Sequence, residues 1–429
     1  MHSATTTRTS HIIQVHDGDE VSGDGNLLTY SKVGAKETFQ GDSWAWGYAA
    51  CGDAFTMQGH SHGGNDVMVG GDFVGLSGSR DAAPQASVSS IFDGGITYAG
   101  DAETMSGYAS GGNDTITGGR DSVEQFMGDA WSMSDSTKGG NDVIHLGMVD
   151  ISRSVEHAAL GDAYDMSGSA HGGADLLFGA DVSTTGGRET ASLNLLAGDA
   201  WEMDQHSVGG ADTLTGGSVF YNSSAEVSAQ DGGQAFVENY IAGDAIYAGE
   251  GSAAAFGNDV LTGGNADAED GSALAVNFIV GDLLVFDDAG GMTFGNDTLH
   301  GGSGSGNAEV ENIMVGDNGY QFGDAAPHGA AAWALDLPGH APALESAAPD
   351  GRIAVVYGND QLYGGNSQAF NLLAGDALRL ETGDRGGNDL LVAGSGANTE
   401  NIMVGDAEWI AAGATGGNDT LVSGMSNDD

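Results

Sequence analysis

The chain has 429 residues, of which 75 are glycine, 61 are acidic and only 11 are lysine or arginine, so its formal net charge is −50. A surface this acidic excludes nucleic acids and anionic membranes as partners, because both bind basic residues. The single cysteine, Cys51, excludes an internal disulfide, and no apolar run reaches the roughly 20 residues of a membrane-spanning helix.

The first 40 residues contain no complete copy of the motifs that fill the rest of the chain, and we expect an N-terminal cap or connector over residues 1–40. The opening "MHSATTTRTSHIIQ" lacks the apolar core of a secretory signal. This predicts a protein that stays inside the cell or is exported by a route without an N-terminal signal.

Two short motifs alternate over residues 41–424. The first motif is apolar-Gly-Asp, with aspartates Asp53, Asp101, Asp129, Asp162, Asp199, Asp244, Asp282, Asp317, Asp376 and Asp406. The second motif is Gly-Asn/Ala-Asp-x-aliphatic, with aspartates Asp66, Asp114, Asp142, Asp175, Asp212, Asp259, Asp297, Asp360, Asp389 and Asp419. The step from the first to the second is 13 residues in seven pairs, 15 in two and 43 in one, whereas the return varies from 15 to 35. The first separation is nearly constant and the second is variable. This indicates a coil in which one side has a fixed length and the other side accepts loops.

Apolar residues recur at fixed offsets from both motifs, as expected for stacked strands with one face inward. Two positions after the second-motif aspartate lie Met68, Ile116, Ile144, Leu177, Leu214, Leu261, Leu299, Leu362, Leu391 and Leu421. Four positions after the first-motif aspartate lie Met57, Met105, Met133, Met166, Met203, Ala248, Phe286, Gln321, Leu380 and Ile410. The second set indicates core packing rather than a copper site, because it accepts Phe, Leu and Ile as well as Met.

A column of asparagines precedes six of the first motifs by five residues: Asn194, Asn239, Asn277, Asn312, Asn371 and Asn401. Stacked asparagines can hydrogen-bond amide to amide and so satisfy buried polar groups. We therefore expect an all-β, right-handed parallel β-solenoid of about ten coils. The Ala- and Pro-rich stretch 318–357 is expected to be an insertion that leaves the stack, and residues 425–429 a short tail.

The aspartate columns need counter-charge. Two carboxylates about 4.8 Å apart repel by about 0.9 kcal/mol even in bulk water, and by more at a protein surface. Ca²⁺ fits best among the common cations, because it takes several oxygen ligands in irregular geometry, whereas Mg²⁺ requires a near-ideal octahedron. The alternative is that Asp and Asn cap their own turns without metal. We expect calcium at all twenty aspartates, because twenty copies and a charge of −50 exceed what turns require.

The segments "GGNDTITGG", "GGNDTLVSG" and "GNDVLTGG" resemble the RTX calcium-binding repeat, G-G-x-G-x-D-x-U-x, of hemolysin-type proteins. The shared features are the Asp, the aliphatic residue two positions later and the flanking glycines. Here the motifs are separated by 13 or more residues rather than joined in tandem, and Asn often precedes the Asp. The resemblance implies calcium at the matched aspartates, type I secretion and an extracellular or cell-surface location.

No H-E-x-x-H, G-x-S-x-G or P-loop lysine motif is present. His60, His62, His171 and His206 occupy comparable places in different repeats, and a functional transition-metal site is not expected from so sparse a column.

Aromatic residues follow the first-motif aspartate by two positions at Phe55, Trp131, Tyr164 and Trp201, and Glu103 and Glu408 interrupt this column. The pattern favours packing in the core over sugar binding. Threonines follow the second-motif aspartate at Thr115, Thr213, Thr298 and Thr420, where Val, Leu and Gln alternate with them.

The favoured hypothesis is a secreted calcium-binding structural protein without enzymatic activity, acting in assembly or adhesion. It would fold on binding calcium and form end-to-end homo-oligomers or polymers, with cell-surface polysaccharide as a candidate partner. Two alternatives stay open: a polysaccharide epimerase or lyase built on a β-helix, and a carbohydrate- or ice-binding module.

Overall fold

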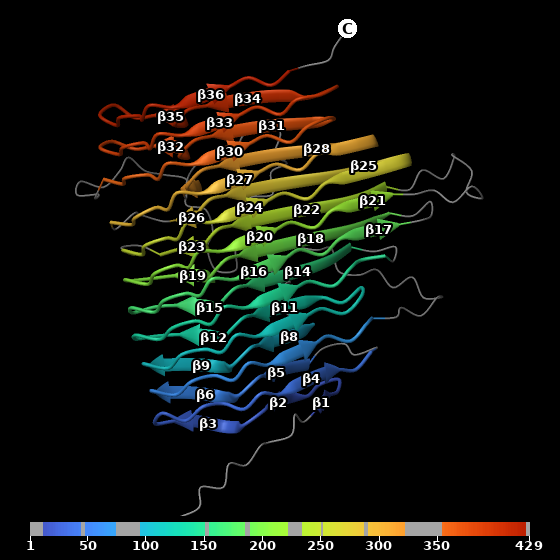
Figure 1. Cartoon of the computed structure of the whole chain (residues 1–429), viewed down its shortest axis with the longest axis vertical. Helices are drawn as coiled ribbons and strands as arrows, with labels where there is room; N and C mark the ends of the chain where they lie inside the picture. The colour runs from blue at the N-terminus through green and yellow to red at the C-terminus, as the bar shows by residue number, and fades with distance from the viewer. Residues whose placement is uncertain are drawn as a thin grey trace, which may run out of the picture.

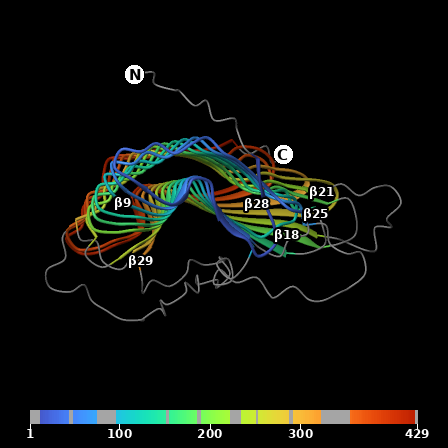
Figure 2. The same ribbon diagram turned by 90° about the horizontal axis from the view of Figure 1, so that it is seen from below.

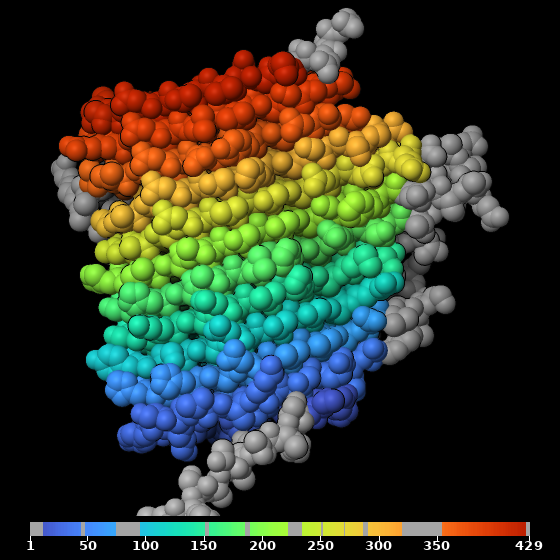
Figure 3. Space-filling view, viewed as in Figure 1, coloured from blue at the N-terminus to red at the C-terminus, as the bar shows by residue number. Residues whose placement is uncertain are grey.

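The computed structural model describes residues 12–43, 48–73, 95–150, 154–184, 189–221, 234–249, 252–286, 291–321 and 354–425. All 36 secondary-structure elements in these ranges are β-strands, and every strand pairs with its neighbours in parallel. The strands form one continuous stack that runs from the N-terminal to the C-terminal end of the described chain (Figure 1). In the space-filling view, successive parts of the chain form successive bands across the molecule (Figure 3). The predicted all-β parallel architecture is confirmed.

Sheet A contains the short strands that follow the second motif, and it has twelve members in chain order. They are β1 (Ile12–Val15), β4 (Thr38–Gly41), β7 (Val67–Val69), β10 (Thr115–Thr117), β13 (Val143–His145), β16 (Leu176–Phe178), β20 (Thr213–Thr215), β24 (Val260–Thr262), β27 (Thr298–His300), β30 (Gln361–Tyr363), β33 (Leu390–Val392) and β36 (Thr420–Val422). The register is strict, since the middle residue of each strand faces the middle residue of the next.

Sheet B contains the strands that lead into the first motif. Its main path is β2 (Glu20–Ser22), β5 (Tyr48–Cys51), β8 (Ile96–Ala99), β11 (Glu124–Met127), β14 (Ser154–Leu160), β18 (Thr190–Ala197), β22 (Gln234–Ala242), β25 (Ala266–Val280), β28 (Gly304–Val315), β31 (Ala369–Ala374) and β34 (Glu400–Val404). Two further strands, β17 (Val182–Thr184) and β21 (Val219–Tyr221), extend it beside β25.

Sheet C contains the strands that follow the first motif. They are β3 (Gly25–Thr29), β6 (Ala54–Gly59), β9 (Ala102–Gly107), β12 (Ala130–Met133), β15 (Ala163–Met166), β19 (Ala200–Met203), β23 (Ala245–Ala248), β26 (Leu283–Phe286), β29 (Asn318–Gln321), β32 (Ala377–Leu380) and β35 (Ala407–Ile410). Seen along the stack, the coils follow one bent outline, with strands of sheet C in one arm and strands of sheet B in the other (Figure 2).

Each coil therefore runs from sheet B through sheet C to sheet A. The structure contains eleven such coils, one more than predicted, because the described part of residues 1–40 supplies β1, β2, β3 and part of β4. Of the expected insertion over 318–357, β29 and residues 354–357 are described, and 322–353 lie outside the described residues. The expected tail is described only at Met425.

Two apolar clusters fill the inside of the coils. The predicted aliphatic column of sheet A is buried from Met68 to Leu391 and packs against residues of sheet B such as Phe126 and Leu196. Its last member, Leu421, is exposed by 47% and lies in the last described coil. The methionine column is buried in a second cluster on sheet C, from Met57 to Met203. Core packing, rather than metal binding, thus accounts for these methionines.

The asparagine column is confirmed. Asn239 donates from Nδ2 to Asn277 Oδ1 at 2.8 Å, and Asn277 donates in turn to Asn312 at 2.9 Å. Each amide also closes the turn that precedes its own strand, as Asn277 does by accepting from the N–H of Gly264 and donating to its carbonyl. Neighbouring coils are therefore joined by buried hydrogen bonds that fix their register.

Candidate metal centres

The aspartates of both motifs lie at the turns of the coil. A first-motif aspartate separates a strand of sheet B from the following strand of sheet C, and a second-motif aspartate immediately precedes a strand of sheet A. Eighteen of the twenty predicted aspartates are at most 3% exposed. The other two, Asp406 and Asp419, belong to the last coil and are half-buried. The predicted columns are therefore internal features of the stack.

The first-motif carboxylates bind a backbone amide of their own coil. Asp101 Oδ2 accepts the N–H of Gly112 at 2.7 Å, and both oxygens of Asp199 accept the N–H of Gly210 at 3.0 Å. In most coils the two residues are 11 positions apart, so this bond ties the first turn of the coil to the second. It is a long-range bond within the coil, not the local Asx turn considered as the metal-free alternative.

The second-motif carboxylates bind across the coil boundary. Asp142 Oδ1 accepts the N–H of Asp114 at 2.6 Å, and Asp175 Oδ1 accepts the N–H of Asp142 at 2.6 Å. The same bond recurs at every step from Glu37 to Asp419. One oxygen of each stacked carboxylate thus has a backbone partner in the preceding coil, a contact that the motif spacing alone does not predict.

The second oxygen of these side chains has no such partner. Nine second-motif aspartates have a buried Oδ2 atom that makes no hydrogen bond to any described residue: Asp66, Asp114, Asp142, Asp175, Asp212, Asp259, Asp297, Asp360 and Asp389. Glycine makes room for these atoms. A methyl group on Gly198 would collide with Asp212 Oδ2 and with the carbonyl oxygen of Gly243 in the next coil. A carboxylate oxygen and a carbonyl oxygen therefore converge on the space that this missing side chain leaves.

The two columns meet in the interior of the coil. Asp199, Asp212 and Asp244 each offer a carboxylate oxygen, and these three atoms lie within 4.8 Å of one another. The same holds for Asp244 with Asp259 and Asp282, and the next triplet consists of Asp282, Asp297 and Asp317. Since calcium–oxygen distances are about 2.3–2.6 Å, two oxygens on one ion lie at most about 5 Å apart. The donor set and its spacing fit calcium, and Asp244 and Asp282 each belong to two triplets.

Burial raises the pKa of these carboxyl groups. Desolvation is the main cause of the raised pKa of Asp66, about 9, and of Asp259, about 8, and it is opposed by one backbone hydrogen bond in each case. At Asp142 the negative charges of Asp129 and Asp175 add to the effect of burial. Either a proton or a cation must therefore neutralise much of this charge in the folded chain.

A further pair of acidic residues belongs to the columns although neither motif identifies it. The N–H of Ala35 donates to Asp24, the N–H of Glu37 donates to Asp66, and Asp24, Glu37 and Asp53 form an additional triplet within 4.8 Å. Glu37 stands where the second motif has aspartate, so the sequence "GAKE" does not match the motif. The separation of 13 residues between Asp24 and Glu37 was the available signal.

The asparagine that precedes many second-motif aspartates has a structural role. Asn296 Oδ1 accepts both the N–H and the Nδ2 of Asn359 in the next coil, at 2.9 and 3.0 Å, on the exposed side of the turn. Asn388 and Asn418 continue this surface ladder. Asparagine at this position therefore supplies hydrogen bonds between coils.

A buried pair of a glutamate and a histidine lies where the internal asparagine column stops. Glu124 and His157 are direct neighbours in sheet B, both fully buried, with His157 Nδ1 3.3 Å from Glu124 Oε2. Glu124 Oε2 also accepts the N–H of Gly147 at 2.7 Å. The next residue of the column is Asn194, the register partner of His157.

The histidines of the described coils form no cluster of metal ligands. His62 is bridged to Ser110, which is bridged to Lys138 and then His171, so His62 and His171 lie three coils apart. His60 stacks on Tyr108 with ring centroids 5.0 Å apart. Every group of three or more acidic, histidine or cysteine ligands found among the described residues is made of acidic residues alone.

The aromatic residues after the first motif pack as expected. Tyr164 stacks between Trp131 and Trp201, at centroid distances of 4.6 and 5.8 Å, against apolar residues of sheet B. In the threonine column, Thr115 and Thr213 are exposed but separated by Val143 and Leu176, so the threonines form no continuous array there.

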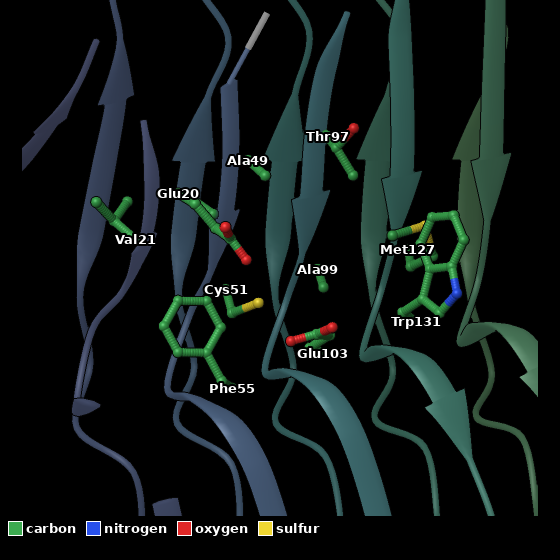
Figure 4. A pocket seen from close by; sticks show the side chains of 11 residues that line it. Glu20, Val21, Ala49, Cys51, Phe55, Thr97, Ala99, Glu103, Met127 and Trp131 are labelled. Carbon is green, nitrogen blue, oxygen red and sulfur yellow. The ribbon is translucent and has the colours of Figure 1, made fainter. Parts of the chain in front are cut away.

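A cavity of about 190 Å³ lies between sheets B and C near the N-terminal end, with Phe55, Glu103 and Trp131 around it (Figure 4). Cys51 lines it and is 8% exposed, as expected for a small buried residue. Burial raises the pKa of Cys51 to about 12, so the side chain is a neutral thiol near pH 7 and a poor nucleophile.

No described segment forms a helix with the length and apolar character needed to cross a bilayer. Comparisons with protein-family models, with curated proteins and with solved structures find no match to this chain. The assignment of a function therefore depends on the acidic columns themselves.

Proposed function

We propose that this chain is a calcium-dependent structural protein in which cations between the two aspartate columns hold successive coils together. The observation that supports this most strongly is the set of nine buried Oδ2 atoms without a hydrogen-bond partner among the described residues. A buried carboxylate oxygen that lacks a donor is strongly unfavourable unless it coordinates a cation or is protonated. The oxygen-only triplets match the ligand chemistry of calcium.

Calcium would then control folding. The ligands of one triplet come from two coils and from positions up to 45 residues apart, as in Asp199 and Asp244, so the unfolded chain has no comparable site. Binding free energy at such a site is folding free energy. A chain that is unfolded at low calcium concentration and folds at high concentration suits export by type I secretion, followed by folding at the cell surface or outside the cell.

The role we propose is assembly or adhesion rather than catalysis. In the described cavity near Cys51, the cysteine is a neutral thiol and therefore a poor nucleophile. The hydrogen bonds of the aspartate columns join one coil to the next. Cell-surface polysaccharide is a candidate partner for such a scaffold. Homo-oligomers are part of the proposal, since the last coil exposes Ile402, Trp409 and Leu421 by 47–50%.

The two ends of the described stack differ, because sheet A has one strand more than the main paths of sheets B and C. Strand β1 adds a twelfth member to sheet A, whereas the main paths of sheets B and C have eleven strands. A second copy that continued all three sheets in register would therefore have to displace β1. End-to-end polymers consequently require either this displacement or a contact that uses only part of the end.

The experiment is circular dichroism and thermal unfolding of the whole chain near pH 7.5, with calcium and with excess chelator. We expect β-sheet signal and a cooperative transition with calcium, and a loss of most of the signal or a large fall in Tm with the chelator. Magnesium at equal concentration serves as the control. An unchanged spectrum and Tm after chelation would refute the proposal.

A further inference from the structure

The cavity between sheets B and C lies in a groove that larger side chains line further along the stack. Along the groove, sheet B presents Leu195, Tyr240 and Phe278 four residues before successive first-motif aspartates, and these side chains pack against sheet C. At the equivalent positions near the N-terminal end the chain has Ala49 and Thr97. These smaller side chains leave the space of about 190 Å³.

The wall on sheet C is an interrupted aromatic column. Glu103 takes the place of an aromatic residue in β9, so that Phe55 in β6 and Trp131 in β12 lie two coils apart, at a spacing of about 9–10 Å. Trp131 stacks on Tyr164 at 4.6 Å on the other side. Figure 4 shows Glu103 between Phe55 and Trp131 along the cavity. The exposed side chain of Glu103 occupies the layer between these two aromatic residues, so the free space lies beside it, toward Ala49 and Thr97 on sheet B.

The cavity is apolar inside and acidic around its opening. Ala99, Met127 and Cys51 form a floor that is at most 8% exposed, whereas Glu20 and Glu103 are exposed. None of the residues that line the cavity is basic. The negative charges of Glu103 and Glu20 act on the buried side of the cavity. Burial is the main cause of the raised pKa of Cys51, and these two charges raise it further.

We propose that this cavity binds a small aromatic ammonium ion, with its ring in the space beside Ala49 and Thr97, against Phe55 and Trp131, and its positive charge against Glu103 and Glu20. The size is suitable, because an engineered apolar cavity of roughly 150 Å³ takes up benzene. Aromatic faces attract cations, and neighbouring carboxylates add to that attraction. An anionic ring would meet two like charges and would be excluded. This site is independent of the aspartate columns.

The probe is benzyltrimethylammonium, added to the calcium-loaded chain labelled with ¹³C in the methionine methyl groups. Phenylacetate is the charge-reversed control and tetramethylammonium the control without a ring. We expect the Met127 signal to shift with benzyltrimethylammonium alone, with a Kd on the order of 1 mM. The Met166 and Met203 signals report on general effects on the stack.

Three variants locate the binding. Thr97→Tyr copies Tyr240 and fills the cavity, and we expect it to abolish binding while Tm stays equal or rises. Glu103→Gln should weaken binding about tenfold, and Trp131→Ala by a similar factor. Asp72→Asn removes an exposed carboxylate elsewhere and should change nothing. Equal shifts with all three probes, no shift with benzyltrimethylammonium, or undiminished binding to Thr97→Tyr would each overturn the proposal.

Discussion

Asp212 Oδ1 accepts the backbone N–H of Asp175 at 2.6 Å, while Oδ2 of the same carboxylate is buried without a hydrogen-bond partner among the described residues. The two oxygens of one side chain thus have different surroundings. An amide in place of the carboxylate would keep the first contact and remove the charge that the second oxygen brings. Replacing this aspartate by asparagine therefore distinguishes two roles. A metal ligand would lose a needed charge, whereas a residue that only closes a turn would keep its contact.

The variant Asp212→Asn should therefore change stability in opposite directions in the two states. With saturating calcium we expect a lower Tm and weaker calcium binding, since one charged ligand is lost from the triplet with Asp199 and Asp244. With excess chelator we expect a higher Tm, since one buried charge is removed. Differential scanning calorimetry of both states measures this, with Asp72→Asn as the matched control. A loss of stability of equal size in both states would indicate a purely structural role.

The calcium-free chain should become more stable as the pH falls. The folded-state pKa values of Asp66 and Asp376, about 9 each, lie above the ordinary value of 3.8. The folded form therefore binds protons more tightly than the unfolded form, and this stabilisation is complete below about pH 4 and disappears as the pH rises toward 9. Thermal unfolding in chelator between pH 5 and pH 9 should show a steadily falling Tm.

With calcium the dependence should reverse, because protons and cations compete for the same oxygens. Calcium affinity, measured by titration calorimetry, should rise over this interval. A Tm in chelator that rose with pH would contradict the burial of charge described above.

The internal asparagine column should contribute more stability than the surface ladder. Asn277→Ala would leave the N–H and the carbonyl of Gly264, and the amides of Asn239 and Asn312, without their partner. At about 1–3 kcal/mol for each buried unsatisfied group, the total loss should exceed about 3 kcal/mol. Urea unfolding in calcium measures it.

The matched control is Asn296→Ala, which removes an exposed asparagine with similar bonds. Water can replace those bonds, and we expect a change below about 0.5 kcal/mol. Equal losses for the two variants would show that burial of the internal column is unimportant.

The buried pair of Glu124 and His157 should behave non-additively. Either Glu124→Asn or His157→Asn alone leaves the remaining polar side chain buried without the neighbour it faces, at a cost of about 1–3 kcal/mol. The double variant extends the asparagine column by two residues beyond Asn194 and should recover most of that loss. A double-mutant cycle from urea unfolding gives the coupling, and losses that simply add would refute the interpretation.

Fixed spacing made much of the fold predictable. The column from Met68 to Leu391 and the asparagines from Asn194 to Asn401 are where the repeats place them, because a parallel stack converts equal offsets in sequence into neighbours in space. The first coil was missed because Glu37 and Lys36 depart from the motif, although the spacing from Asp24 is preserved.

Other features depend on how the strands turn, which spacing does not specify. The groove between sheets B and C forms because the coil bends between them, so that Trp201 and Phe278 join one apolar cluster. The different partners of the two oxygens of Asp212 follow from the direction of a backbone N–H in the preceding coil. Neither is visible in residue types alone.

Asp244 and Asp282 are each shared by two adjacent triplets, and this sharing has a consequence for titration. If calcium binds at the triplets as proposed, occupancy of one triplet alters the ligands available to the next, and the triplets should behave as a one-dimensional lattice with nearest-neighbour coupling. Filling should then proceed as a zipper rather than as independent saturation. Replacing Asp244, which joins two of the three connected triplets, should make the steep calcium-binding isotherm shallower, whereas replacing Asp317, at the end of the three, should only reduce the number of coupled sites.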